Sequence, residues 1–165
     1  MTNVGITNCV ELNWWDSYLY TKKNEGSSSP SSDEKEGEVR KALEDNKAGS
    51  VQIVFTPAKH WTSRTPWDKN SVLWGSYAVL CTSARFWFSG DTAYDDKVFK
   101  TIGSKYGPFH IAAIGIGAYR PRYFMKDSHV NPEEAVRIHQ DLGALQSVGI
   151  HWGTFPLSDE DPIGR

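Results

Sequence analysis

Residues 85–92 read RFWFSGDT, an aromatic run that ends in a Gly-Asp-Thr turn. Aromatic runs of this kind are typical of a β-strand, and Gly and Asp are typical of the turn that follows one. Side chains at a strand end can converge in a cleft, because the sheet holds their backbone rigid. We therefore expect a strand over Arg85–Ser89 that presents Asp91 at one edge of a sheet.

Further strands are expected on both sides of this one. Each candidate is a short run rich in β-branched, aromatic or other apolar residues. The candidates are Val4–Leu12, Val51–Thr56, Ser71–Thr82, His110–Gly117 and Val148–His151. The run Ser71–Thr82 is predicted to pair antiparallel with Arg85–Ser89 around a turn near Ser83. The nearly continuous apolar run HIAAIGIG over His110–Gly117 predicts a strand buried on both faces.

Two segments carry helix signals. Asp95–Tyr106 has apolar residues at helical spacing and stops before a Gly-Pro pair. The run NPEE over Asn131–Glu134 is the signature of a capped helix start, with Asn as the cap and Pro at the first helical position. A strand-rich first half followed by strand, helix and strand indicates a sheet covered by helices, an α/β chain with layers of the α+β type.

Size and composition exclude several classes of protein. A chain of 165 residues is about one domain, and its net charge of -2 gives no nucleic-acid footprint. No apolar run approaches the ~18 residues of a membrane span, and no signal peptide is visible. The two cysteines, Cys9 and Cys81, are expected to be reduced, largely buried thiols. We expect an intracellular protein that is soluble or peripherally attached to a membrane.

Residues 21–50 depart from this globular composition. They contain the run SSSPSSDEKE and few apolar residues. Such a segment cannot bury enough surface to offset the entropy lost when a chain is ordered. We expect a flexible polar loop within the domain.

Three residues with candidate metal chemistry follow predicted strands. His60 comes shortly after Val51–Thr56, Asp91 follows the aromatic run, and His151 ends the last strand. Two imidazoles and one carboxylate fit part of a zinc site, because zinc takes histidine nitrogen and aspartate oxygen as ligands. From the residues alone the alternative stays open that both histidines are hydrogen-bonded structural residues and that Asp91 caps a turn.

Several short motifs in order strengthen the zinc interpretation. They are TPAKHW (56–61), VLWGS (72–76), FWFSGDT (86–92), GPF (107–109), IGAYRPR (116–122), HVNPEEA (129–135) and HWGTF (151–155). Together they resemble the N-acylphosphatidylethanolamine-hydrolysing phospholipases D of the metallo-β-lactamase superfamily. The resemblance covers about residues 5–155 apart from the polar loop. The GDT motif alone is common to the superfamily, whereas GAYxPR, HVNPEEA and HWGTF are far more specific.

The resemblance implies a two-zinc hydrolase. In it Asp91 would bridge both ions, His60 would bind one and His151 the other. His129 would be an active-site histidine that contacts the phosphate or assists proton transfer, whereas from its position alone it would be a loop histidine before a helix cap. Ser128, beside it, and Tyr119 would belong to the substrate-binding surface.

The remaining histidines and two arginines are expected to matter less. His110 opens a buried strand and His139 lies on a helix, so both are expected to be structural or exposed. Arg120 and Arg122 flank Pro121 and form either a phosphate-facing edge or a solvated pair.

The superfamily motif H-x-H-x-D-H is absent, since no two histidines are separated by a single residue. It would supply four of the seven ligands expected for two zincs. The resemblance implies an αββα sandwich, of which this chain would be mostly the C-terminal half, a partial domain over residues 1–165. We expect one sheet with its helices and an exposed apolar face, in a truncated sequence that begins at an internal Met1 and stops before a terminal helix.

The leading functional hypothesis is hydrolysis of N-acylphosphatidylethanolamine to N-acylethanolamine and phosphatidic acid. The alternatives are another hydrolase of the same fold, acting on a lactone or a soluble phosphodiester, and a truncated, inactive fragment. The expected partners are the phospholipid, a membrane surface and a second copy in a homodimer. The chain shows no convincing amphipathic anchor, so membrane contact is expected from the missing half or from a dimer.

Overall fold

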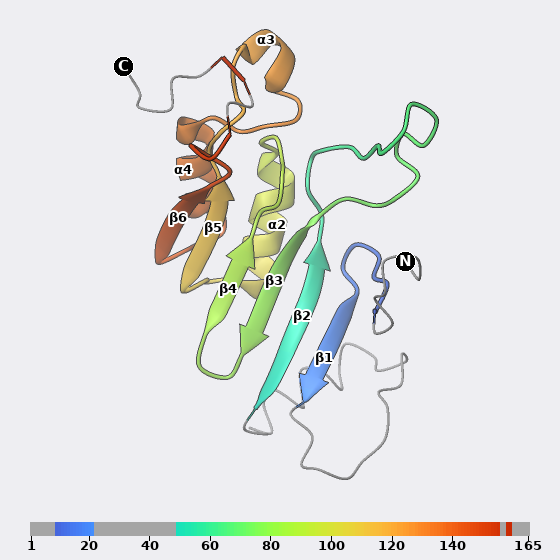
Figure 1. The fold of residues 1–165 in the computed structure, drawn as a ribbon. Helices are drawn as coiled ribbons and strands as arrows, with labels where there is room; N and C mark the ends of the chain where they lie inside the picture. Colours follow the sequence, from blue (N-terminus) through green and yellow to red (C-terminus); the bar gives the residue numbers. More distant parts are fainter. Residues whose placement is uncertain (1–8, 22–48, 156–157, 160–165) are drawn as a thin grey trace.

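The computed structural model describes residues 9–21, 49–155 and 158–159. Within that part of the chain the strands form one six-stranded sheet in the order β1-β2-β3-β4-β5-β6 (Figure 1). The strands are β1 (Ser17–Thr21), β2 (Ser50–Thr56), β3 (Ser76–Cys81), β4 (Arg85–Phe88), β5 (Ile111–Gly115) and β6 (Gln146–Ile150). The helices are α2 (Asp96–Tyr106), α3 (Arg122–Met125) and α4 (Pro132–Asp141).

The sheet is mixed, and its topology gathers the candidate side chains at one edge. Strands β1 to β4 are antiparallel neighbours, whereas β4, β5 and β6 are parallel. It follows that β2, β4, β5 and β6 all run the same way and end at the same edge, which lies at the top in Figure 1. We call it the upper edge. The segments that carry His60, Asp91, Tyr119 and His151 leave the sheet there.

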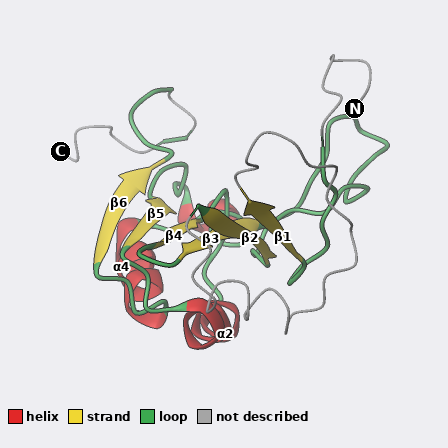
Figure 2. Cartoon of the chain, turned by 90° about the horizontal axis from the view of Figure 1, so that it is seen from below, coloured by secondary structure: helices red, strands yellow, loops and turns green. Residues whose placement is uncertain are grey.

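The two longer helices begin where the sequence predicts. Asp95 caps α2 by accepting hydrogen bonds from the backbone N–H groups of Lys97 and Val98. Asn131 caps α4 in a reciprocal capping box with Glu134. Figure 2 shows both helices on the same side of the sheet.

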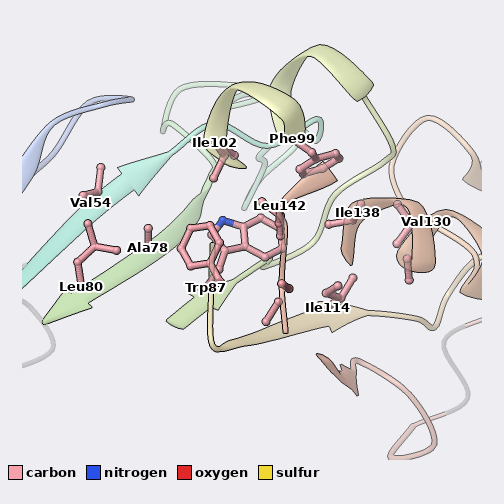
Figure 3. Close-up of a cluster of buried hydrophobic side chains, with 14 residues drawn as sticks. Val54, Ala78, Leu80, Trp87, Phe99, Ile102, Ile114, Val130, Ile138 and Leu142 are labelled. Atoms are coloured by element: carbon pink, nitrogen blue, oxygen red, sulfur yellow. The ribbon is translucent and has the colours of Figure 1, made fainter. Parts of the chain in front are cut away.

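Between these helices and the sheet lies the hydrophobic core (Figure 3). Trp87 of β4 is fully buried and meets the ring of Phe99 of α2 edge to face, with 5.8 Å between ring centroids. Ile102, Ile138 and Leu142 are also fully buried in this cluster. Alternate residues of the strands therefore point to the helices, as the period of a β-strand requires.

The other face of the sheet stays open in the described part of the chain. Large apolar side chains on it are 36% to 53% exposed: Tyr20, Tyr77, Phe86, Phe88, Ile111 and Val148. An exposed apolar face of this kind is unusual for a complete soluble domain. It agrees with the expectation of one sheet of a two-sheet sandwich.

Several sequence-based predictions need correction. Residues 9–12 form no strand, and residues 4–8 lie outside the described residues. Instead Asp16 and Asn13 make a tight turn, in which Trp15 has a φ of 76°, and β1 starts at Ser17. The strand expected from Ser71 begins only at Ser76.

Further differences lie near the C-terminus and at the cysteines. Strand β6 begins at Gln146 rather than Val148, and the one-turn helix α3 was not expected. Both cysteines are free as predicted, but Cys9 is exposed and Cys81 only half-buried, so the expected burial is wrong. Most of the polar loop, residues 22–48, lies outside the described residues. None of the helices described is long and apolar enough to cross a membrane.

Candidate metal centre

Four of the predicted site residues converge at the upper edge. The candidate ligand atoms of His60, Asp91 and His129 all lie within 4.8 Å of one another. Nε2 of His151 lies 3.5 Å from Oδ1 of Asp91. The ring of His129 stands edge-on to His60 at 5.2 Å and is stacked against His151 at 5.4 Å, measured between ring centroids. We had predicted these four residues from the sequence, and the fold brings them together from four separate loops.

The hydrogen bonding of His60 prepares one nitrogen for a metal. Its Nδ1 lies 2.7 Å from the carbonyl oxygen of Trp61. Because a carbonyl oxygen can only accept, Nδ1 donates in this contact, and in a neutral imidazole the lone pair is then on Nε2. Among the described residues Nε2 is buried and has no hydrogen-bond partner. A metal-binding histidine commonly donates its other N–H to a carbonyl in this way, and buried polar atoms are rarely left unpaired.

Thr92 directly follows Asp91 and hydrogen-bonds to two other loops of the site. The sequence did not single it out. Its hydroxyl accepts a hydrogen bond from the N–H of Lys59, next to His60. Its carbonyl accepts one from the N–H of Val130, next to His129. Thr92 itself is 3% exposed. One buried residue therefore fixes the spacing between the carboxylate and two imidazoles.

Close backbone packing positions His151. Its φ of 57° lies in the left-handed region, which residues other than glycine adopt uncommonly. A Cβ added to Gly117 would collide with the His151 carbonyl oxygen, so the close approach of the two segments requires glycine there. Backbone strain of this kind persists where the surrounding structure enforces it and is common at functional sites.

Arg122 holds the loop that carries His129. Its Nη2 donates to both carboxylate oxygens of Glu134, at 2.9 and 3.0 Å, and its Nη1 donates to the His129 carbonyl at 2.8 Å. Glu134 also accepts from the N–H of Asn131, the helix cap. Arg122 is thus neither a phosphate-facing group nor part of a solvated pair, the two options left open by the sequence. Glu134 lies twelve residues from Arg122 along the chain, so the sequence alone did not indicate this contact.

We predict that Arg122→Lys lowers the free energy of unfolding by about 1–3 kcal/mol, because lysine cannot make the forked contact and leaves a half-buried carboxylate poorly paired. Urea denaturation measures this change. The matched control is Arg137→Lys on α4, an exposed arginine whose guanidinium lies 6.0 Å from the centroid of the Tyr94 ring. If Arg122→Lys and Arg137→Lys lowered the free energy of unfolding equally, the contacts of Arg122 with Glu134 and the His129 loop would not contribute as assigned.

A pocket of about 520 Å³ opens beside the cluster. His60 and Asp91 form one part of its lining, and Arg64 and Asp68 contribute charge. Much of the remaining wall is aromatic: Phe55, Trp61, Trp74 and Tyr77. A mostly apolar pocket with a few polar groups at one end is the usual form of a ligand site.

Other predicted residues lie at or near this site. Ser128 directly precedes His129, and its N–H donates to the Met125 carbonyl. Tyr119 is half-buried with the Arg120 guanidinium 5.8 Å from its ring centroid. Neither Ser128 nor Tyr119 is among the described residues that line the pocket. Their role in substrate binding stays a prediction.

The two remaining histidines have structural contacts. Nδ1 of His110 accepts a hydrogen bond from the N–H of Arg85, which joins the starts of β4 and β5. Nδ1 of His139 lies 2.8 Å from the Ser147 hydroxyl. Both agree with the expectation that these residues are structural or exposed.

Comparison with known proteins places this geometry in a family. A family model described as "Beta-lactamase superfamily domain" matches residues 3–152. The chain is 44% identical, over 93% of its length, to N-acyl-phosphatidylethanolamine-hydrolyzing phospholipase D 1 of Caenorhabditis elegans. It is 33% identical, over 97% of its length, to the mitochondrial N-acyl-phosphatidylethanolamine-hydrolyzing phospholipase D of Saccharomyces cerevisiae. A metal-dependent hydrolase of Shouchella clausii is 28% identical over 67% of the chain and 46% of that relative.

The matched region is only a part of the two phospholipases. It covers 36% of the Caenorhabditis elegans protein and 30% of the Saccharomyces cerevisiae protein. The chain therefore spans about a third of the length of these relatives.

Proposed function

The chain belongs to the β-lactamase superfamily and has the metallo-β-lactamase fold, and we propose that it acts in a zinc-dependent phosphodiesterase of the phospholipase D type. The substrate would be N-acylphosphatidylethanolamine, and the products N-acylethanolamine and phosphatidic acid. The observation that carries the proposal is the cluster of His60, Asp91 and His129, in which Nε2 of His60 is buried without a hydrogen-bond partner among the described residues. The identity of 44% to a phospholipase of that name supports the choice of substrate.

The donor set fits zinc. Histidine nitrogen and aspartate oxygen are ligands that zinc takes, and the candidate ligand atoms of His60 and Asp91 lie within 4.8 Å of each other. His60 and Asp91 would hold one ion, and Asp91 and His151 would share a second. When bound, such a pair of ions supplies an activated water and polarises the phosphoryl oxygen.

His129 would orient the phosphate. An imidazole titrates near neutral pH, so it can donate a hydrogen bond to a phosphate oxygen or pass a proton. The contacts of Arg122 and Thr92 with its loop hold this ring between His60 and His151. Precise placement matters, because catalysis falls steeply when a reacting group is displaced by about 1 Å.

The pocket beside the cluster would take the lipid. Its aromatic lining suits an apolar chain, while His60 and Asp91, which also line it, suit the phosphodiester. Binding energy from the apolar part can then be used to hold the phosphate in place.

The test is product analysis with the zinc-loaded protein. Detergent-dispersed N-acylphosphatidylethanolamine, a lactone and a soluble phosphodiester are offered separately, and products are identified by mass spectrometry. We expect N-acylethanolamine and phosphatidic acid from the first, at a rate far above that of the others. Good cleavage of the lactone or the soluble ester without cleavage of the phospholipid would overturn the choice of substrate. Bound zinc without cleavage of any ester would identify an inactive fragment.

A further inference from the structure

The motif VLWGS (72–76) contributes no candidate metal ligand, yet it lies beside the residues that lead to His60. It ends the connection between β2 and β3, and its last residue, Ser76, pairs with Thr56 at the end of β2. Figure 1 shows both ends of this connection at the upper edge of the sheet. We call residues 56–60 the His60 segment. The start of β3 therefore lies directly beside this segment.

Ser76 hydrogen-bonds the start of the His60 segment. Its hydroxyl oxygen lies 3.0 Å from the Pro57 carbonyl, 3.3 Å from the Thr56 carbonyl and 2.7 Å from the Thr56 hydroxyl. The indole N–H of Trp87 can only donate, and it lies 3.4 Å from the Thr56 hydroxyl oxygen. The Thr56 hydroxyl is then free to donate to Ser76, and the Ser76 hydroxyl to donate to the Pro57 carbonyl. All three side chains are fully buried, so these bonds are shielded from water.

Trp74 binds the next carbonyl of the segment. Its indole Nε1 donates to the Ala58 carbonyl at 2.9 Å. Trp14 supports this ring, because it meets Trp74 edge to face, with 5.7 Å between ring centroids, and donates to the Trp74 carbonyl. The consecutive carbonyls of Thr56, Pro57 and Ala58 thus all accept hydrogen bonds from side chains of one motif.

The loop that carries Asp91 binds the same segment from another side. The Lys59 N–H donates to the Thr92 hydroxyl at 3.0 Å, and the Lys59 carbonyl accepts from the Ala93 N–H at 2.7 Å. Each carbonyl of residues 57–59 therefore has a hydrogen bond, and so does the amide next to His60. A segment bonded in this way opens rarely, so it holds the imidazole in one place.

Gly75 allows the close approach of the motif. A Cβ added there would lie 2.5 Å from the Phe55 ring and 2.6 Å from the Thr56 carbonyl oxygen, which is closer than van der Waals contact allows. The Gly75 carbonyl also lies near Gly90, where an added Cβ would come within 3.0 Å of its oxygen. The motif is therefore packed between the end of β2 and the residue before Asp91.

We propose that Trp74 and Ser76 are positioning residues of the metal centre, because their hydrogen bonds to consecutive backbone carbonyls fix where Nε2 of His60 lies. The imidazole is oriented by the contact of its Nδ1 with the Trp61 carbonyl. Hydrogen bonds that hold metal ligands from outside commonly contribute about 10–100-fold to metal affinity. The consequence for zinc rests on the proposed function, whereas the placement of the segment rests on the hydrogen bonds alone.

The test measures zinc affinity of the full chain by competition with a chromophoric chelator. Ser76→Ala removes the hydroxyl, and Trp74→Phe removes the indole N–H but keeps an aromatic ring. We expect each variant to bind zinc at least about tenfold more weakly than the parent. Affinity is measured rather than hydrolysis because Trp74 also lines the pocket.

The matched control is Val54→Ala, which removes buried methyl groups from β2, the strand that leads into the His60 segment. Valine donates no side-chain hydrogen bond, so this variant should lose stability but keep the zinc affinity of the parent. An effect that came from lower stability alone would weaken zinc binding in the control as well.

A second measurement needs no metal. Hydrogen exchange is followed at the Lys59 amide, which donates to Thr92, and at the amide of the fully buried Leu142. In Ser76→Ala and Trp74→Phe the ratio of the Lys59 rate to the Leu142 rate should rise at least about tenfold, because the segment opens locally. In Val54→Ala this ratio should stay that of the parent.

Unchanged zinc affinity in both folded variants would overturn the positioning role, and so would an equal loss of affinity in Val54→Ala. Zinc binding as expected without hydrolysis of any ester contradicts the proposed function and leaves the positioning role supported. If the parent binds no zinc, the metal centre of the proposed function fails, and the exchange ratio decides the role of the motif. A raised ratio then supports that role, and an unchanged ratio overturns it.

Discussion

Replacing Asp91 with asparagine is expected to lower the hydrolysis of N-acylphosphatidylethanolamine by at least about 10³-fold. The carboxylate is the anionic member of the cluster and the one proposed to be shared by both ions. An amide keeps the shape but loses the charge, and a metal site supplies several kcal/mol of transition-state stabilisation, which corresponds to several powers of ten in rate. The turnover rate and the zinc content of the purified variant should fall together.

Two comparison variants make this result specific. Asp96→Asn changes an exposed carboxylate on α2, paired only with Lys100 among the described residues, and should leave rate and zinc content unchanged. His129→Ala should lower the rate by about 10²–10⁴-fold while zinc stays bound, because His129 is assigned to the phosphate. Loss of zinc from the His129 variant would show that this residue is a ligand and that its assignment to the phosphate is wrong.

The largest expected effect on stability is at Trp87. Replacement by alanine should lower the free energy of unfolding by about 3–5 kcal/mol, since truncating a buried Trp leaves a cavity that its neighbours fill only in part. The side chain is fully buried against Phe99, and its Nε1 lies 3.4 Å from the Thr56 hydroxyl. Denaturant unfolding followed by circular dichroism measures the change.

A second tryptophan provides the control. Trp67 is 91% exposed, so Trp67→Ala should change the free energy of unfolding by no more than about 0.5 kcal/mol. A cost below about 1 kcal/mol for Trp87→Ala would mean that the helices and the sheet do not pack around this ring.

Much of the fold follows from local sequence signals. The caps at Asp95 and Asn131 were predicted because a cap is a contact between residues two or three positions apart. The apolar run before Gly115 predicted β5, in which Ala112, Ala113 and Ile114 are buried. The expectation of burial on both faces is wrong at Ile111, which is 41% exposed on the open face of the sheet. Strand β1 (SYLYT) was missed, since it is short and its partners in β2 lie 29 to 37 positions further along the chain.

Some residues of the site could likewise be predicted from the sequence, and others could not. His60, Asp91 and His151 could be proposed as neighbours because each follows a strand, and the parallel run of these strands brings their ends together. Thr92 and Arg122 could not be assigned their roles from sequence. Their contacts join segments that are distant along the chain, and nothing local marks a threonine or an arginine that will hold a histidine loop.

The most direct test of the central claim is a crystal of the zinc-loaded protein measured above and below the zinc absorption edge. The cluster of His60, Asp91 and His129, with His151 beside Asp91, predicts anomalous density within ligand distance of Nε2 of His60 and of the Asp91 carboxylate. A second peak is expected between Asp91 and His151. Anomalous density elsewhere on the chain, with none at these four side chains, would contradict the metal centre and the hydrolytic function derived from it.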